Sequence, residues 1–377
     1  MTKLRSTIHL LLFFSLFPGA TRAEITLNEV YKFKIFSDFR LRYENDWDSE
    51  NASGVPREDR ERLRIRARLG AEIEPIPSIT LGARLRTGAK DSQQSPHVTI
   101  IDFNDNPVGD QDAVFDKWYA RYARDSFWIW GGRNSFPFWK QNELFWDDDV
   151  TPAGIAAGYN LSKEYGKFSF NGGVFKLPDG AVDFNGSLAA GQIVYSSAFK
   201  NVVLTLAGGV FAIDGETGSE NLLNGNGARD YTLWVGNAQL KFIEAPLPVT
   251  LGLDIMHNSE DYSLADPDPF TVKNRNQKDG YVLSLLAGKS KEPGDWLAGY
   301  YYAHVETLAV NASYAQDDWM RWGTANQTDA SNFKGHEFRM GVTLTKRLNI
   351  LARLYLVDAI TSVQDGKRFR IDLNYEF

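Results

Sequence analysis

The residues with the clearest chemical potential are arginines that recur at every second position. Their guanidinium groups stay charged at any relevant pH, and they present several N–H donors to a carboxylate or a phosphate. A wall of such side chains is suited to brief contact with anionic groups on small solutes. The set comprises Arg40, Arg42, Arg62, Arg64, Arg66, Arg68, Arg84, Arg86, Arg368 and Arg370.

A second set of charged residues has the opposite sign. The segment 134–152 contains Glu143 and the run Asp147, Asp148 and Asp149. An acidic segment that faces a basic wall creates a transverse field, which orients dipolar solutes and sorts ions. Two simpler interpretations stay open. The charged side chains could serve only to pair with each other, or the acidic run could be a solvated loop.

The elements that carry the arginines are predicted to be β-strands. Between Arg62 and Glu74, apolar residues from Leu63 to Ile73 alternate with charged residues. The last ten residues repeat this period and end on Phe377 in strand phase. A strand separates such residues onto two faces, whereas a helix would scatter them around its circumference.

Counting these segments predicts about sixteen strands. Short connections alternate with long ones, which is typical of a barrel with short periplasmic turns and long extracellular loops. The segments lie near 31–43, 62–74, 79–88, 114–123, 126–133, 154–161, 167–176, 187–195, 202–212, 230–242, 249–257, 280–288, 296–305, 335–344, 348–357 and 368–377.

The direction of the apolar face decides between a soluble and a membrane barrel. A closed sheet of about sixteen strands has an interior too wide for side chains to fill. We therefore expect the polar face to line the interior and the apolar face to meet lipid, with closure leaving no unpaired backbone edge. The predicted fold is an all-β, transmembrane, antiparallel β-barrel. Two stacked β-sandwiches are the soluble alternative, but they explain neither the loop lengths nor the arginine-rich faces.

The N-terminus resembles a secretory signal. Lys3 and Arg5 precede an apolar run from Ile8 to Phe17, and small residues follow up to Ala23. We expect residues 1–23 to be removed and residues 24–377 to form the barrel. Loss of three basic residues and no acidic one changes the formal charge from −7 to −10. A chain this acidic is not expected to bind nucleic acid.

Several segments together resemble Gram-negative outer-membrane porins, including a family of "putative porins" with sixteen strands. The resemblance rests on Arg62–Gly70 with Pro75–Pro77 at the next turn, on Gly131–Arg133, on Gly294–Tyr302 and on the terminal strand Arg368–Phe377. It implies location in the outer membrane, passive diffusion of small hydrophilic solutes and frequent trimerisation. The terminal Phe377 resembles the signal that the barrel-assembly machinery reads. The expected surroundings are outer-membrane lipid and lipopolysaccharide.

The resemblance also implies that the third long loop, 134–152, folds into the pore and faces the basic wall. We therefore expect a constriction that favours anionic or zwitterionic solutes. Two other functions stay open. One is a barrel that sheathes a partner such as a multihaem cytochrome, and the other is a barrel enzyme with a site near the rim.

Cofactor and metal chemistry have little support in the sequence. The chain has no cysteine, and the histidines after residue 23 are His97, His257, His304 and His336. No two of these have metal-ligand spacing on one face. Neither a bound cofactor, a metal site nor a catalytic residue is predicted.

Overall fold

A computed structural model describes residues 23–26, 32–215, 229–243, 247–262, 269–320 and 330–377. Residues 1–22, which make up nearly all of the predicted signal, lie outside this part. None of the helices in these ranges is long and apolar enough to cross a bilayer. The one helix that they contain, α1, spans Pro269–Asn274.

Sixteen long antiparallel strands form a closed barrel, and each corresponds to one segment predicted from the sequence. Two short strands join them: β1 (Ala23–Thr26) pairs with β2, and β5 (Val98–Asp102) pairs with β3. The long strands are β2 (Lys32–Trp47), β3 (Arg60–Ile76), β4 (Ile79–Thr87), β6 (Ala113–Arg124), β7 (Phe127–Arg133), β8 (Ala153–Lys163), β9 (Gly166–Asp179), β10 (Asp183–Phe199), β11 (Val202–Asp214), β12 (Tyr231–Phe242), β13 (Val249–Asn258), β14 (Asp279–Gly288), β15 (Trp296–Val305), β16 (Phe333–Thr345), β17 (Leu348–Ala359) and β18 (Asp365–Glu376).

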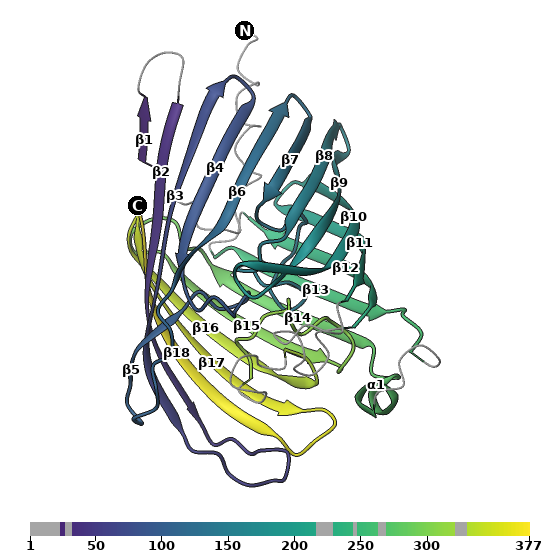
Figure 1. Ribbon diagram of the computed structural model, residues 1–377. Helices are drawn as coiled ribbons and strands as arrows, with labels where there is room; N and C mark the ends of the chain where they lie inside the picture. The colour runs from purple at the N-terminus through teal and green to yellow at the C-terminus, as the bar shows by residue number, and fades with distance from the viewer. Residues whose placement is uncertain (1–22, 27–31, 216–228, 244–246, 263–268, 321–329) are drawn as a thin grey trace.

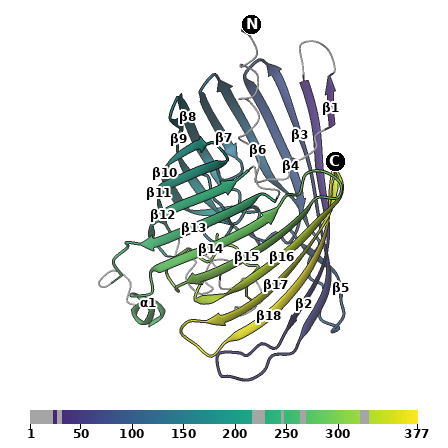
Figure 2. The same cartoon turned by 180° about the vertical axis from the view of Figure 1, so that it is seen from behind.

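The barrel closes where the last long strand meets the first. Strand β18 pairs with β2, with Arg42 opposite Asp372 and Arg40 opposite Asn374 (Figure 2). The terminal residue extends this pairing, because the backbone N–H of Phe377 donates to the carbonyl of Ser37. Closure satisfies the backbone groups that an open edge would leave unpaired.

The connections differ in length at the two ends of the barrel. The turns after β3, β6, β8 and β10 contain two residues each, and the β3–β4 turn lies at the upper end in Figure 1. Most connections at the opposite end are long, as predicted. Those from β9 to β10 and from β17 to β18 are shorter, with three and five residues.

The apolar face of the strands points outward. Leu69 is 54% exposed and Met340 is 68% exposed, whereas Arg42 and Arg86 are almost completely buried. This inverts the distribution in a soluble protein, in which charged side chains face water and leucines are buried. The outer surface is therefore suited to lipid.

The interior is not polar throughout, which differs from the prediction. Along β9 to β12 the inner face includes the apolar residues Phe175, Leu188, Phe211 and Val235 beside polar ones such as Gln192. The apolar residues pack against aromatic side chains of the segment 134–152, such as Phe138 and Phe145. A loop inside the barrel needs a surface against which it can bury its own apolar side chains, and this half of the wall supplies it.

Candidate constriction site

The ten predicted arginines form a continuous basic wall on the inner face of β2, β3, β4 and β18. No side chain in this wall exposes more than 18% of its surface. Strand register places Arg40 opposite Arg66, and Arg42 opposite Arg64. Like charges directly across a sheet are destabilising, so this wall requires compensation from nearby carboxylates.

Carboxylates on the same strand faces supply part of that compensation. Asp372 accepts two hydrogen bonds from Arg42, at 2.7 and 3.1 Å. Asp38 accepts from Arg66 at 2.9 Å and from Arg68 at 2.6 Å. Strand carboxylates that lie within 4.0 Å of the wall include Asp38, Glu44, Asp46, Asp116 and Asp372.

These five partners were not singled out from the sequence. Their signal was the same period of two, since Asp38, Glu44 and Asp46 share a strand face with Arg40 and Arg42. Counting acids in phase with the arginines would have found most of them.

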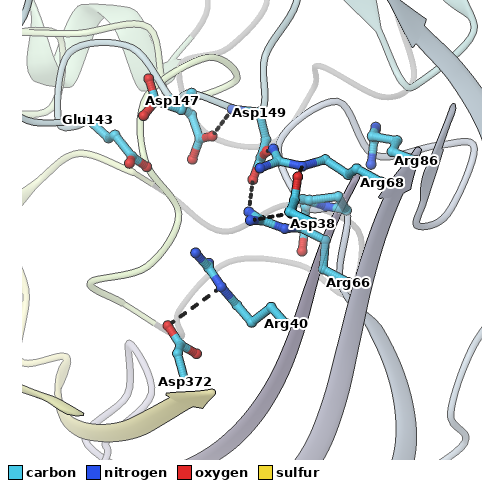
Figure 3. Close-up of polar contacts among 12 residues, drawn as sticks. Asp38, Arg40, Arg66, Arg68, Arg86, Glu143, Asp147, Asp149 and Asp372 are labelled. Atoms are coloured by element: carbon cyan, nitrogen blue, oxygen red, sulfur yellow. Dashed lines mark hydrogen bonds and ion pairs between the residues drawn. The ribbon is translucent and has the colours of Figure 1, made fainter. Parts of the chain in front are cut away.

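The segment 134–152 crosses the interior of the barrel, as Figure 3 shows for its acidic end. Asp149 lies 2.7 Å from Arg68 and 3.6 Å from Arg66, both on β3. Near the middle of the segment, the side-chain amide of Gln141 donates to Asp254 on β13 at 2.8 Å. The segment is therefore fixed to opposite parts of the wall.

The four predicted acids of this segment have different surroundings. Only Asp149 forms ion pairs with the basic wall. Asp148 pairs with Lys140 in its own loop, and Asp147 accepts the backbone N–H of Asp149 at 2.7 Å. Glu143 accepts a hydrogen bond from the side chain of Gln316 at 3.2 Å.

Burial and neighbouring charges separate the pKa values of these acids. Burial favours the neutral form of Asp149, but Arg66 and Arg68 outweigh it and lower the pKa to about 2. Burial and the nearby Asp148 raise the pKa of Glu143 to about 7. Burial also raises the pKa of Asp147 well above its usual value. Asp149 is therefore ionised at neutral pH, whereas Glu143 loses its proton close to neutral pH.

A further acid from another loop reaches the wall. Asp318 lies 3.7 Å from Arg42 and forms a closer ion pair with Arg370. It belongs to the β15–β16 connection, which the sequence did not predict to enter the barrel. No residue pattern marks it, because its burial depends on packing against distant segments.

The described ranges contain no cluster of three or more His, Asp or Glu side chains that could hold a metal ion. The charged groups of the interior are instead arranged as a basic wall and acids that cross to it. Such an arrangement exerts a field on a solute without forming a covalent bond to it.

The chain is similar to one described protein family and to several solved structures. The profile of a family described as "Putative porin" matches residues 50–190. The structure of OprB from Pseudomonas putida is similar, with a TM-score of 0.56 and 11% identity over 92% of this chain and 94% of that one. OmpF from Salmonella typhi, in a complex with daunomycin, has a TM-score of 0.54 and 13% identity over 94% of this chain and 100% of that one.

The chain is an outer-membrane β-barrel with the porin fold. A third neighbour of this barrel is OmpT from Vibrio cholerae with its loop L8 deleted, at a TM-score of 0.53 and 11% identity over 93% of this chain and 100% of that one. Another OmpT structure is described as a trimer. A search of curated proteins gave no match. Together the family profile and the fold support an outer-membrane channel.

Proposed function

We propose that this porin-fold barrel is a channel for passive diffusion of small hydrophilic solutes and that it favours anionic or zwitterionic ones. The observation that carries the proposal is the charge balance of the basic wall. Its ten arginines share five strand carboxylates and two loop carboxylates, Asp149 and Asp318. In these ion pairs the arginines therefore outnumber the carboxylates.

Arg40 is the wall residue best placed to meet a solute. Its nearest carboxylate oxygen, on Asp372, lies 3.9 Å away, and its Nε donates to the neutral side chain of Asn374 at 2.6 Å. Figure 3 shows its guanidinium extending from the wall toward the acidic loop. An anionic group that passes here gains a charge-assisted hydrogen bond without displacing a tight ion pair.

A zwitterionic solute fits the same field in one orientation. Its carboxylate faces the arginines while its ammonium group faces the acidic loop, where Asp149 is ionised and Glu143 is partly ionised at neutral pH. A transverse field lowers the free energy of the aligned dipole and so favours its passage.

The test is single-channel recording of the purified protein in a planar bilayer under a salt gradient. Discrete open steps with a reversal potential of the sign that anions produce would support both parts of the proposal. Strong cation selectivity that persists after Asp149→Asn would refute the anion preference. A correctly folded barrel without conductance would refute the channel itself.

The sheath alternative gains no support from the structure. A partner protein needs space in the lumen, but segments 134–152 and 306–320 of the chain itself pack there. We therefore do not propose it.

We propose that residues 1–23 are removed on export, and that Phe377 carries the signal for the barrel-assembly machinery. The exposed apolar band would contact lipid, and the long loops would contact lipopolysaccharide. A homotrimer is proposed from the fold that this chain shares with the OmpT structure described as a trimer.

A further inference from the structure

The β15–β16 connection enters the barrel and is buried there. From Thr307 to Gln316 every residue is buried, and Leu308, Ala309 and Val310 have no exposed surface. A long loop at this end of a barrel is ordinarily expected in solvent. Its burial calls for specific partners for its backbone groups, since water is excluded.

The first partner is the segment 134–152. The backbone N–H of Asp147 donates to the carbonyl of Tyr314 at 2.7 Å, and that of Gln316 donates to the carbonyl of Glu143 at 3.0 Å. The rings of Trp146 and Tyr314 stack with centroids 5.4 Å apart. The two segments therefore form one structural unit across the lumen.

The second partner is the β4–β5 connection. Gln93 and Gln94 are both buried, and their side-chain amides donate to backbone carbonyls of the β15–β16 loop. The acceptors are Ser313 at 2.7 Å, Ala312 at 2.8 Å and Ala315 at 2.6 Å. Buried amides that satisfy buried carbonyls fix the position of the loop.

The third partner is the basic wall, through Asp318. Its carboxylate lies 3.7 Å from Arg42 and 3.6 Å from Arg353, and it pairs closely with Arg370. Its backbone carbonyl accepts a hydrogen bond from Arg368 at 2.7 Å. These arginines come from β2, β17 and β18, so one side chain joins the loop to three adjacent strands.

We propose that the constriction is built by two clasped loops, 134–152 and 306–320, and that Asp318 is the positioning residue that holds the second loop against the wall. Asp318 also sets specificity, because it neutralises part of the positive charge of Arg42 and Arg370. The inference rests on the proposed channel function. The inference adds a second selectivity element, on loop 306–320, which lies far from loop 134–152 in the sequence.

Asp318→Asn tests the role of the carboxylate, with Asp125→Asn in the exposed turn after β6 as the control. The control removes a carboxylate from an exposed pair with Arg124, outside the lumen. We expect Asp318→Asn to raise single-channel conductance roughly twofold and to shift the reversal potential toward anions, because the loop loosens and arginine charge is released. Equal conductance and selectivity in wild type and both variants would overturn the proposal.

A cysteine pair tests the clasp without altering Asp318. The side chains of Glu143 and Gln316 are in contact, and the chain has no cysteine of its own. In Glu143→Cys/Gln316→Cys, an added oxidant such as copper phenanthroline accepts the two electrons as an S–S bond replaces two S–H bonds. We expect loss of both free thiols in the folded barrel, while each single-cysteine variant keeps its thiol.

The two tests separate the clasp from the channel function. Crosslinking requires no conductance, so thiol loss in the cysteine pair together with a folded wild-type barrel that does not conduct would support the clasp and refute the channel. A conducting barrel in which both thiols remain free would overturn the clasp and leave the channel intact.

Discussion

Asp149 lies 2.7 Å from Arg68, and this contact fixes the acidic loop to the basic wall. The same guanidinium holds Asp38 on the neighbouring strand at 2.6 Å. Arg68 therefore bridges two carboxylates, one from the barrel and one from the loop inside it. Charge-assisted hydrogen bonds of this kind are stronger than neutral ones and give a defined geometry.

Asp149→Asn should loosen the loop and make the channel more anion-selective. The substitution removes the loop carboxylate nearest to Arg66 and Arg68, while Asp38 still pairs with both arginines. We expect the anion-to-cation permeability ratio to rise roughly twofold or more, with increased current noise. Reversal potentials and open-channel noise in planar bilayers provide the measurement.

The control for this prediction is Asp125→Asn in an exposed turn. Asp125 pairs only loosely with Arg124, and both side chains are largely exposed. An exposed pair of this kind contributes little. If Asp125→Asn changed selectivity as much as Asp149→Asn, the effect would come from net charge and not from the constriction.

Arg40→Gln should lower the preference for anions without unfolding the barrel. Asp372, its nearest carboxylate, keeps its two hydrogen bonds from Arg42, so no buried acid loses its main partner. We expect the anion-to-cation permeability ratio to fall roughly twofold. Reversal potentials measure the ratio, and heat-modifiable migration in gels checks the fold.

Arg124→Gln is the matched control, because its side chain is 72% exposed at a turn. It removes the same charge outside the lumen and should leave the permeability ratio unchanged. An unchanged ratio in Arg40→Gln itself would show that solutes do not pass this side chain.

The sequence predicted the strands and their inward faces, but not the contacts that the loops make inside the barrel. A period of two fixes which side chains share a face, so the phase of β3 and the inward direction of Arg62 to Arg68 followed directly. The burial of loop 306–320 depends on contacts such as that between Gln94 and Ala312, which lie 218 residues apart. The aromatic contacts of loop 134–152 also join it to strands that are distant in the sequence. No local period encodes such contacts, because they arise only once the barrel has closed.

Selectivity should also depend on pH through Glu143. Burial and Asp148 raise its pKa to about 7, with a further contribution from Asp318 on the second loop, while Lys140 and Arg353 oppose the shift. The group is neutral at lower pH and ionised at higher pH. We therefore expect anion preference to fall as pH rises through about 7, because a negative charge then appears in the lumen.

Reversal potentials between about pH 5 and about pH 9 would show this change, and Glu143→Gln should abolish it. Two neighbours are not expected to contribute. Asp149, with a pKa of about 2, stays ionised throughout. Burial and the surrounding arginines Arg42 and Arg64 lower the pKa of His97 well below its usual value, so it is neutral at the pH where Glu143 titrates.

Titration of Asp147 in place of Glu143 is the result that would contradict this prediction. Burial and the neighbouring Glu143 raise its pKa too. A pH response that persisted in Glu143→Gln and vanished in Asp147→Asn would assign the titration to Asp147 and contradict the prediction.

Leu69→Arg should destabilise the barrel, although Arg68 beside it is tolerated. Leu69 is 54% exposed on the outer face near the middle of β3, whereas Arg68 points inward to Asp38 and Asp149. An arginine on the lipid face costs roughly 2–4 kcal/mol at the bilayer midplane. Urea unfolding in lipid vesicles measures this loss, with Leu69→Met as an apolar control of similar volume. Equal unfolding free energies for Leu69→Arg and Leu69→Met would mean that this face of β3 does not contact hydrocarbon, and the inside-out arrangement of the barrel would be wrong.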